Sequence, residues 1–181
     1  MGEAVVIVPY DPGWPRLFRE LGASIRSALG TVALRIDHIG STSIPGLAAK
    51  PVIDVQVSVA GFEPLDAYCA PLKSLGFVFR ADNPDLTKRY FRESPGTRRT
   101  HIHVRRAGSW SEQFALLFRD YLRVHDDDAR RYAEVKRRLA AQFGEDRHGY
   151  TDAKGPIIWE IMERAACWSQ ESGWEPGRSD A

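Results

Sequence analysis

Residues 38–57 decide the fold, and they read HIGSTSIPGLAAKPVIDVQV. A strand predicted over 33–39 ends at Gly40, a run of hydroxyl side chains follows over 41–43, and a second strand is predicted over 51–59. Because glycine has no Cβ, a ligand can approach the backbone at such a turn. Free N–H groups and hydroxyls there are donors for phosphate oxygens. The stretch therefore predicts an anion site at the end of a strand.

Asp54 is the acidic residue of the second strand. Side chains alternate between the two faces of a strand, so Asp54 lies on the face opposite to Ile53 and Val55. A carboxylate fixed beside the turn is suited to holding Mg²⁺ against a polyphosphate. A polar turn followed by an exposed aspartate is the alternative interpretation of the same pattern.

The rest of the chain predicts an α+β fold, because mixed strands come first and helices follow. We expect one domain over residues 1–170 and a flexible tail over 171–181. Strands are predicted over 5–8, 33–39, 51–59, 77–80, 88–93 and 100–105, and helices begin near residues 15, 65, 109, 126 and 151.

Composition excludes several classes of function. The 181 residues carry a net charge of +1, which argues against a general binder of nucleic acid. Two scattered cysteines, Cys69 and Cys167, indicate a reducing compartment. The N-terminus lacks the pattern of a signal peptide, and no stretch approaches the roughly 18 apolar residues of a spanning helix. We therefore expect a cytoplasmic location and no membrane partner.

His101 and His103 lie two residues apart on the strand predicted over 100–105, so they face the same side. They predict a metal or phosphate site beside Asp54, and an exposed pair on a half-buried strand is the alternative.

A basic cluster lies around the same strand, and it consists of Arg98, Arg99, Arg105 and Arg106. These guanidinium groups could hold an anionic substrate by bidentate contacts, or they could belong to a solvated turn. Lys50 and Lys154 could neutralise a phosphate or lie on the surface.

Ordered motifs along nearly the whole chain resemble the GrpB family, which belongs to the DNA polymerase beta-like nucleotidyltransferase superfamily. The motifs that carry the resemblance are Tyr10-Asp11-Pro12-Gly13-Trp14-Pro15, His38-Ile39-Gly40-Ser41-Thr42-Ser43, Pro45-Gly46-Leu47, Lys50-Pro51-Val52-Ile53-Asp54, His101-Ile102-His103-Val104, Phe118-Arg119-Asp120-Tyr121-Leu122-Arg123 with His125, Tyr132 with Lys136, and Tyr150 with Lys154.

This resemblance implies a nucleotidyltransferase-like mixed sheet, with helices packed mainly on one side and a helical C-terminal half. In the superfamily, two acids at i and i+2 on one strand and a third on a neighbouring strand hold two Mg²⁺ ions. This chain departs from that pattern, because Gln56 stands at the second position and His103 at the third. Imidazole suits Zn²⁺ and other borderline metals better than Mg²⁺.

The expected site residues follow from the motifs and the resemblance together. The catalytic residue is Asp54; the phosphate- or nucleotide-binding residues are Gly40, Ser41, Thr42, Ser43, Lys50, Arg99, Arg105 and Lys154; the metal ligands are Asp54, Gln56, His101 and His103. The expected cofactor is a divalent cation, Mg²⁺ or Mn²⁺.

Three functions remain open at this point. The first is transfer of a nucleotidyl group from a nucleoside triphosphate to a small acceptor. The second is non-catalytic binding of a nucleotide or another phosphorylated small molecule. The third is an interaction domain, as in GrpB-like extensions of dephospho-CoA kinase. In the first two, the partner is a nucleotide or another phosphorylated small molecule.

Overall fold

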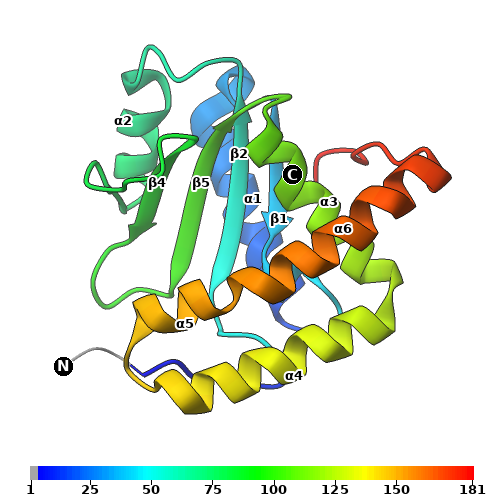
Figure 1. The fold of residues 1–181 in the computed structure, drawn as a ribbon. Helices are drawn as coiled ribbons and strands as arrows, with labels where there is room; N and C mark the ends of the chain where they lie inside the picture. The colour runs from blue at the N-terminus through cyan, green and yellow to red at the C-terminus, as the bar shows by residue number, and fades with distance from the viewer. Residues whose placement is uncertain (1–3) are drawn as a thin grey trace.

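The computed structural model describes residues 4–181 and contains a five-stranded mixed sheet (Figure 1). The strands are β1 (Arg35–Ile39), β2 (Ile53–Val59), β3 (Phe77–Phe79), β4 (Lys88–Glu93) and β5 (Thr100–Arg106), and their order across the sheet is β1-β2-β5-β4-β3. Only β2 and β5 run parallel; the other neighbours are antiparallel. The predicted α+β class is confirmed.

Six α-helices accompany the sheet in the described part of the chain. They are α1 (Trp14–Leu29), α2 (Asp66–Ser74), α3 (Trp110–Val124), α4 (Asp126–Phe143), α5 (Arg147–Ala153) and α6 (Gly155–Ser172). Short 3₁₀ turns cover Gly30–Val32 and Ser41–Ser43. Within residues 4–181, no helix combines the length and apolar character needed to cross a membrane.

The two faces of the sheet differ in character because side chains alternate along each strand. The apolar side chains of β2, from Ile53 to Val59, pack with α1 and α2 into one core. Figure 1 shows α1 behind the sheet and α6 on the opposite side. The opposite face of β2 and β5 carries polar side chains, namely Asp54, Gln56, Ser58, His101, His103 and Arg105. The polar side chains of β2 and β5 therefore lie together on one face of the sheet.

A second core joins the helical half to the loop that follows the Gly-Ser turn. Ile44, Leu47 and Ala48 of this loop pack against side chains of α3, α4 and α6, including Tyr132 and Ile161. This packing fixes the turn over residues 41–43 against α4.

Three elements differ from the sequence expectation. The strand predicted over 5–8 is a single bridge between Val8 and Ala49. The last predicted helix is divided at Lys154, where α5 ends and α6 begins; Pro156 lies in the first turn of α6 and has no N–H for a continuous helical ladder.

The end of the chain is the third difference, because a flexible tail was expected from residue 171. In the structure α6 extends to Ser172, and the last residues lie along β1. The Asp180 carboxylate accepts hydrogen bonds from the backbone N–H of His38 and from Arg119, both at 2.9 Å. These contacts were not visible in the sequence because they join residues more than 60 positions apart.

Gly40 requires both its backbone conformation and its lack of a side chain. Its φ of 70° lies in the left-handed region, where residues with a Cβ are strained. A Cβ at this position would lie 2.6 Å from Oδ2 of Asp54. Gly40 therefore allows the turn to approach the carboxylate.

We predict that Gly40→Ala lowers the free energy of unfolding by about 2–4 kcal/mol, since it combines backbone strain with a clash. Gly46→Ala is the matched control, because Gly46 has a φ of 75° but a Cβ added there would meet no heavy atom within 4 Å. The control should cost only about 1 kcal/mol. Urea denaturation measures both, and equal losses would contradict the role of the Asp54 contact.

Candidate metal and anion site

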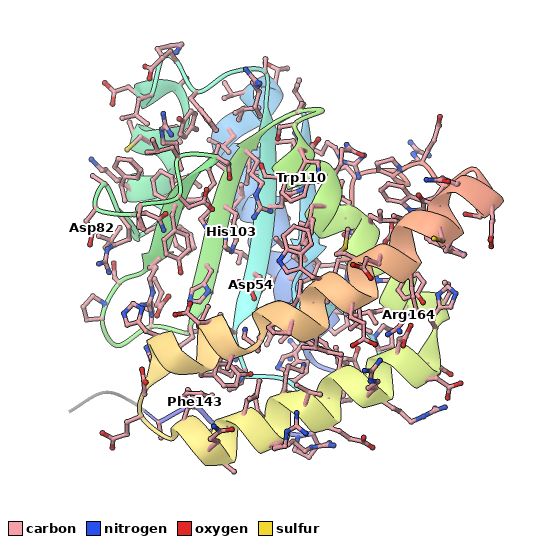
Figure 2. All side chains as sticks on the ribbon, viewed as in Figure 1. Asp54, Asp82, His103, Trp110, Phe143 and Arg164 are labelled. Carbon is pink, nitrogen blue, oxygen red and sulfur yellow. The ribbon has the colours of Figure 1, made fainter. Side chains whose placement is uncertain are left out.

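Asp54, His101 and His103 form a compact cluster on the polar face of the sheet. The parallel register of β2 and β5 sets Asp54 opposite His101 and Gln56 opposite His103. Oδ1 of Asp54 lies 3.1 Å from Nδ1 of His101 and 3.2 Å from Nε2 of His103. The expectation that Asp54 and His103 lie on adjacent strands is confirmed. Figure 2 shows these two side chains on the side of the sheet where α5 and α6 lie.

The cluster fits a divalent metal ion. One ligand atom from each of Asp54, His101 and His103 lies within 4.8 Å of the others. Two atoms bound to one ion at about 2.0–2.2 Å lie no more than about 4.4 Å apart, so small shifts of these side chains would bring all three atoms onto a single ion. One carboxylate and two imidazoles leave coordination positions open for a substrate, and this donor set suits borderline metals.

The protonation states of the cluster also suit a metal. Burial alone would raise the pKa of Asp54, but hydrogen bonds from His101 and His103 hold it well below its usual range. Burial lowers the pKa of His103 to about 4. At neutral pH the site therefore offers a carboxylate and a neutral His103 imidazole, which are the forms that bind metals.

Gln56 lies next to this cluster but is already bonded within the protein. Its buried Oε1 accepts a hydrogen bond from Nη1 of Arg105 at 2.5 Å. Its Nε2 donates to the carbonyl of Glu112 at 3.4 Å. The structure thus places Gln56 on the expected face. Gln56 was expected to bind a metal and Arg105 to bind phosphate, but here the two side chains hydrogen-bond to each other.

The three hydroxyls of the turn have different environments. Oγ1 of Thr42 donates to the carbonyl of Val52 at 3.0 Å, and Oγ of Ser43 donates to the carbonyl of Gly40 at 2.6 Å. These two side chains stabilise the loop. Oγ of Ser41 instead accepts a hydrogen bond from Nζ of Lys136 at 3.0 Å.

Lys136 lies beside this turn, and it was not among the expected site residues although it belongs to one of the family motifs. It is 2% exposed, it donates to the carbonyl of Ala48 at 2.6 Å, and its Nζ lies 4.5 Å from the ring centroid of Tyr132. Within residues 4–181 no carboxylate forms an ion pair with it, and burial lowers its pKa to about 7. One signal was available: Lys136 follows Tyr132 by one helical turn on the apolar face of its helix.

Lys50 and Lys154 lie over the ring of Tyr150, and each Nζ is 4.8 Å from the ring centroid. Burial, together with the positive charges of Lys154 and Arg99 among others, lowers the pKa of Lys50 to about 8. Burial also lowers the pKa of Lys154. In the described chain neither lysine has a carboxylate within ion-pair distance.

Arg99 lies at the border of this positive region. Its Nε is 3.8 Å from the carboxylate of Glu93, which also accepts a hydrogen bond from the backbone N–H of Thr100. Lys50, Lys136 and Lys154 have no carboxylate within ion-pair distance in the described chain, and like charges gathered in this way are unfavourable unless an anion joins them. The lysines and the turn therefore form a region suited to a multiply charged anion, next to the metal-type cluster.

The fold places this chain in a structural class. The structure resembles that of Cid1 in complex with its short product ApU, with a TM-score of 0.50 and 15% identity over 72% of this chain and 42% of that chain. A likeness at this identity shows the fold alone. This chain has a nucleotidyltransferase-like fold.

Residues 4–164 match the GrpB protein family, and the chain belongs to that family. The crystal structure of the conserved protein GrpB from Enterococcus faecalis has a TM-score of 0.82 and 30% identity, covering 94% of this chain and all of that one. A UPF0157 protein of Halalkalibacterium halodurans is 39% identical over 162 residues, which is 90% of this chain and 83% of the relative.

A dephospho-CoA kinase of Mycolicibacterium paratuberculosis is also similar, with 33% identity over 95% of this chain. This chain spans only 48% of the length of that kinase.

The unpaired burial of Lys136 leads to a prediction about pH. Between pH 7 and 9 the unfolded chain binds about one more proton at this residue than the folded chain does, so wild-type stability rises with pH relative to a variant without the lysine. The stability of Lys136→Met, compared with that of wild type at the same pH, should therefore be greatest at low pH. We expect its stability difference from wild type to shift by about 2 kcal/mol across this window.

Chemical denaturation of both proteins at several pH values measures this shift. Lys73→Met is the control, because Lys73 is exposed on the surface. A flat difference for Lys136→Met would show that Lys136 titrates like a surface lysine.

Proposed function

We propose that this chain binds a nucleoside triphosphate, or another small molecule with a phosphate chain, at the face formed by Ser41, Asp54 and Lys136. The observation that supports this most strongly is the group of three buried or half-buried lysines without carboxylate partners in the described chain, Lys50, Lys136 and Lys154. A phosphate chain supplies the negative charge that these groups lack. Arg99 borders the same region.

We further propose that Asp54, His101 and His103 hold one divalent ion, with Gln56 as a buried neighbour. A bound ion there would neutralise charge on the phosphate oxygens. The donor set favours Zn²⁺ and other borderline ions, and its two imidazoles accept Mn²⁺ more readily than Mg²⁺. Asp54 is the residue that links the two parts of the site, because its Oδ1 lies within hydrogen-bond distance of both histidines and its Oδ2 lies 2.6 Å from where a Cβ on Gly40 would be.

The reaction that this arrangement supports is nucleotidyl transfer to a small acceptor. The acceptor hydroxyl oxygen forms a bond to the α-phosphorus as the bond from that phosphorus to the bridging oxygen breaks. Pyrophosphate leaves, and the hydroxyl proton passes to water. Ser41 and the lysines would hold the phosphates during this step, and Gly40 allows the substrate to approach the backbone.

Metal binding gives the first test. Wild type should bind Mn²⁺ more tightly than Mg²⁺, and Asp54→Asn and His103→Ala should each weaken Mn²⁺ binding at least about tenfold. His148→Ala is the matched control, because His148 is exposed on α5 outside the cluster. Isothermal titration measures the affinities. Equal Mn²⁺ affinity in all four proteins would exclude a metal at this cluster.

Phosphate binding gives the second test. A hydrogen bond to a charged group contributes about 1.5–3 kcal/mol, so Lys136→Met or Lys154→Met should weaken tripolyphosphate binding about 10- to 100-fold. Lys73→Met should leave it unchanged. If Lys136→Met and Lys154→Met both bind tripolyphosphate as tightly as wild type does, the proposed anion site is contradicted.

Activity distinguishes transfer from binding alone. Release of pyrophosphate from one of the four common nucleoside triphosphates with Mn²⁺, in the presence of candidate acceptors, would support the transferase. Tight binding without release in such screens would favour the non-catalytic nucleotide-binding alternative.

The kinase relatives favour a second candidate function. Since the match covers nearly all of this chain but half of the dephospho-CoA kinase, a domain of this kind can be part of a larger protein. An interaction role, in which the domain supports a partner enzyme, is therefore the alternative. No heat from any nucleoside triphosphate, with or without metal, would favour it.

A further inference from the structure

Two exposed tryptophans and a partly buried phenylalanine form a surface that we call the aromatic face: Trp110 and Phe114 of α3, and Trp159 of α6. The rings of Trp110 and Trp159 are stacked, with centroids 6.1 Å apart and planes at 24°. The ring of Phe114 is edge-on to that of Trp159, with centroids 5.6 Å apart, and its centroid lies 4.9 Å from that of Trp110. Trp110 is 67% exposed and Trp159 is 55% exposed.

The fold does not need these two indoles for its core. The buried residues of α6 are Ile157, Ile161, Met162 and Ala165. Trp159 follows Ile157 by two residues, about 200° around the helix, so it points away from that core. Trp110 is the first residue of α3, directly after the N-cap Ser109. Exposed, mutually stacked tryptophans indicate a binding surface.

Each of the two helices that carry the aromatic face also has a residue at or beside the candidate site. Trp159 is five residues beyond Lys154, which is about 7.5 Å along the helix axis and about 140° around it. The first turn of α3 contacts the polar face of the sheet, where the Glu112 carbonyl accepts the hydrogen bond from Gln56. Gln56 is two residues from Asp54 on β2. In Figure 2, Trp110, Asp54 and His103 appear on the same side of the sheet.

We propose that the aromatic face stacks the nucleobase of the nucleotide whose phosphates lie at the lysines. This inference rests on the proposed function, and it adds a subsite for the base. The ribose and the phosphate chain would bridge the interval between Trp159 and the lysines. Because every base has a π-face, stacking on indoles tolerates all four bases. We therefore expect weak selection among nucleotides at this subsite.

The size of the aromatic face favours a small ring over a protein partner. Three aromatic side chains bury at most about 150–250 Å² each, and these rings already cover part of one another. A stable protein interface needs about 800 Å² from each partner. A planar base matches the two stacked indoles in size and chemistry.

The test compares two ligands that differ in having a base. Affinities for ATP and for tripolyphosphate are measured by titration with wild type, Trp110→Ala, Trp159→Ala and the control Trp174→Ala. Trp174 lies beyond α6, and its ring N–H bonds to Asp120. Trp110→Ala and Trp159→Ala should each weaken ATP binding about tenfold and leave tripolyphosphate binding unchanged. Trp159→Phe should retain part of the ATP affinity, because a phenyl ring still stacks.

The outcomes separate this inference from the proposed function. If tripolyphosphate binding depends on Lys136 but the tryptophan variants bind ATP like wild type, only the base subsite is overturned. If wild type binds neither ligand, the anion site and the base subsite both fail. Light scattering on the same proteins detects self-association. If wild type is a dimer, Trp159→Ala is a monomer and both bind ATP equally well, the aromatic face is a protein interface instead.

Discussion

The parallel pairing of β2 with β5 is the interaction on which the site depends. It is the one parallel pair of the described sheet, and its register sets Asp54 beside His101. A shift of one residue would turn either Asp54 or the histidines to the apolar face, because side chains alternate with a period of two. The apolar residues of β2 hold the register by packing against α1 and α2. Core packing on one face thus fixes the polar cluster on the other.

Charge divides this polar face into two regions. Around Asp54 the two imidazoles stabilise a carboxylate, and the pKa of that carboxyl falls. Around Tyr150 and Ser41 the lysines have no carboxylate within ion-pair distance in the described chain, and burial lowers the pKa of Lys136 and Lys50. Burying charged groups without ion-pair partners lowers the stability of a folded protein. Groups with strongly shifted pKa values gather at functional sites. A metal-bound phosphate chain would satisfy both regions at once.

The departures from the superfamily pattern have a structural explanation here. Gln56, at the second acidic position, is buried and pairs with Arg105 rather than facing Asp54. His103, at the third position, turns its Nε2 toward Asp54. Asp54, His101 and His103 therefore lie together on two neighbouring strands, with one carboxylate and two imidazoles in place of three carboxylates. One ion of the borderline kind fits that set better than two Mg²⁺ ions.

The sequence by itself determined the α+β class, the positions of β1, β2, β4 and β5 to within two residues, and the shared face of His101 and His103. These features follow from local periodicity, which depends only on backbone geometry. The family motifs added the turn at Gly40 and the expectation that Asp54 belongs to a site. Only the tertiary structure decided that Thr42 and Ser43 bond within the loop and that Gln56 pairs with Arg105. It also decided that Lys136, 95 residues after Ser41, donates to that hydroxyl, and that Trp110 stacks on Trp159. Such contacts depend on how helices pack against the sheet, and a single sequence does not encode that packing in any local pattern.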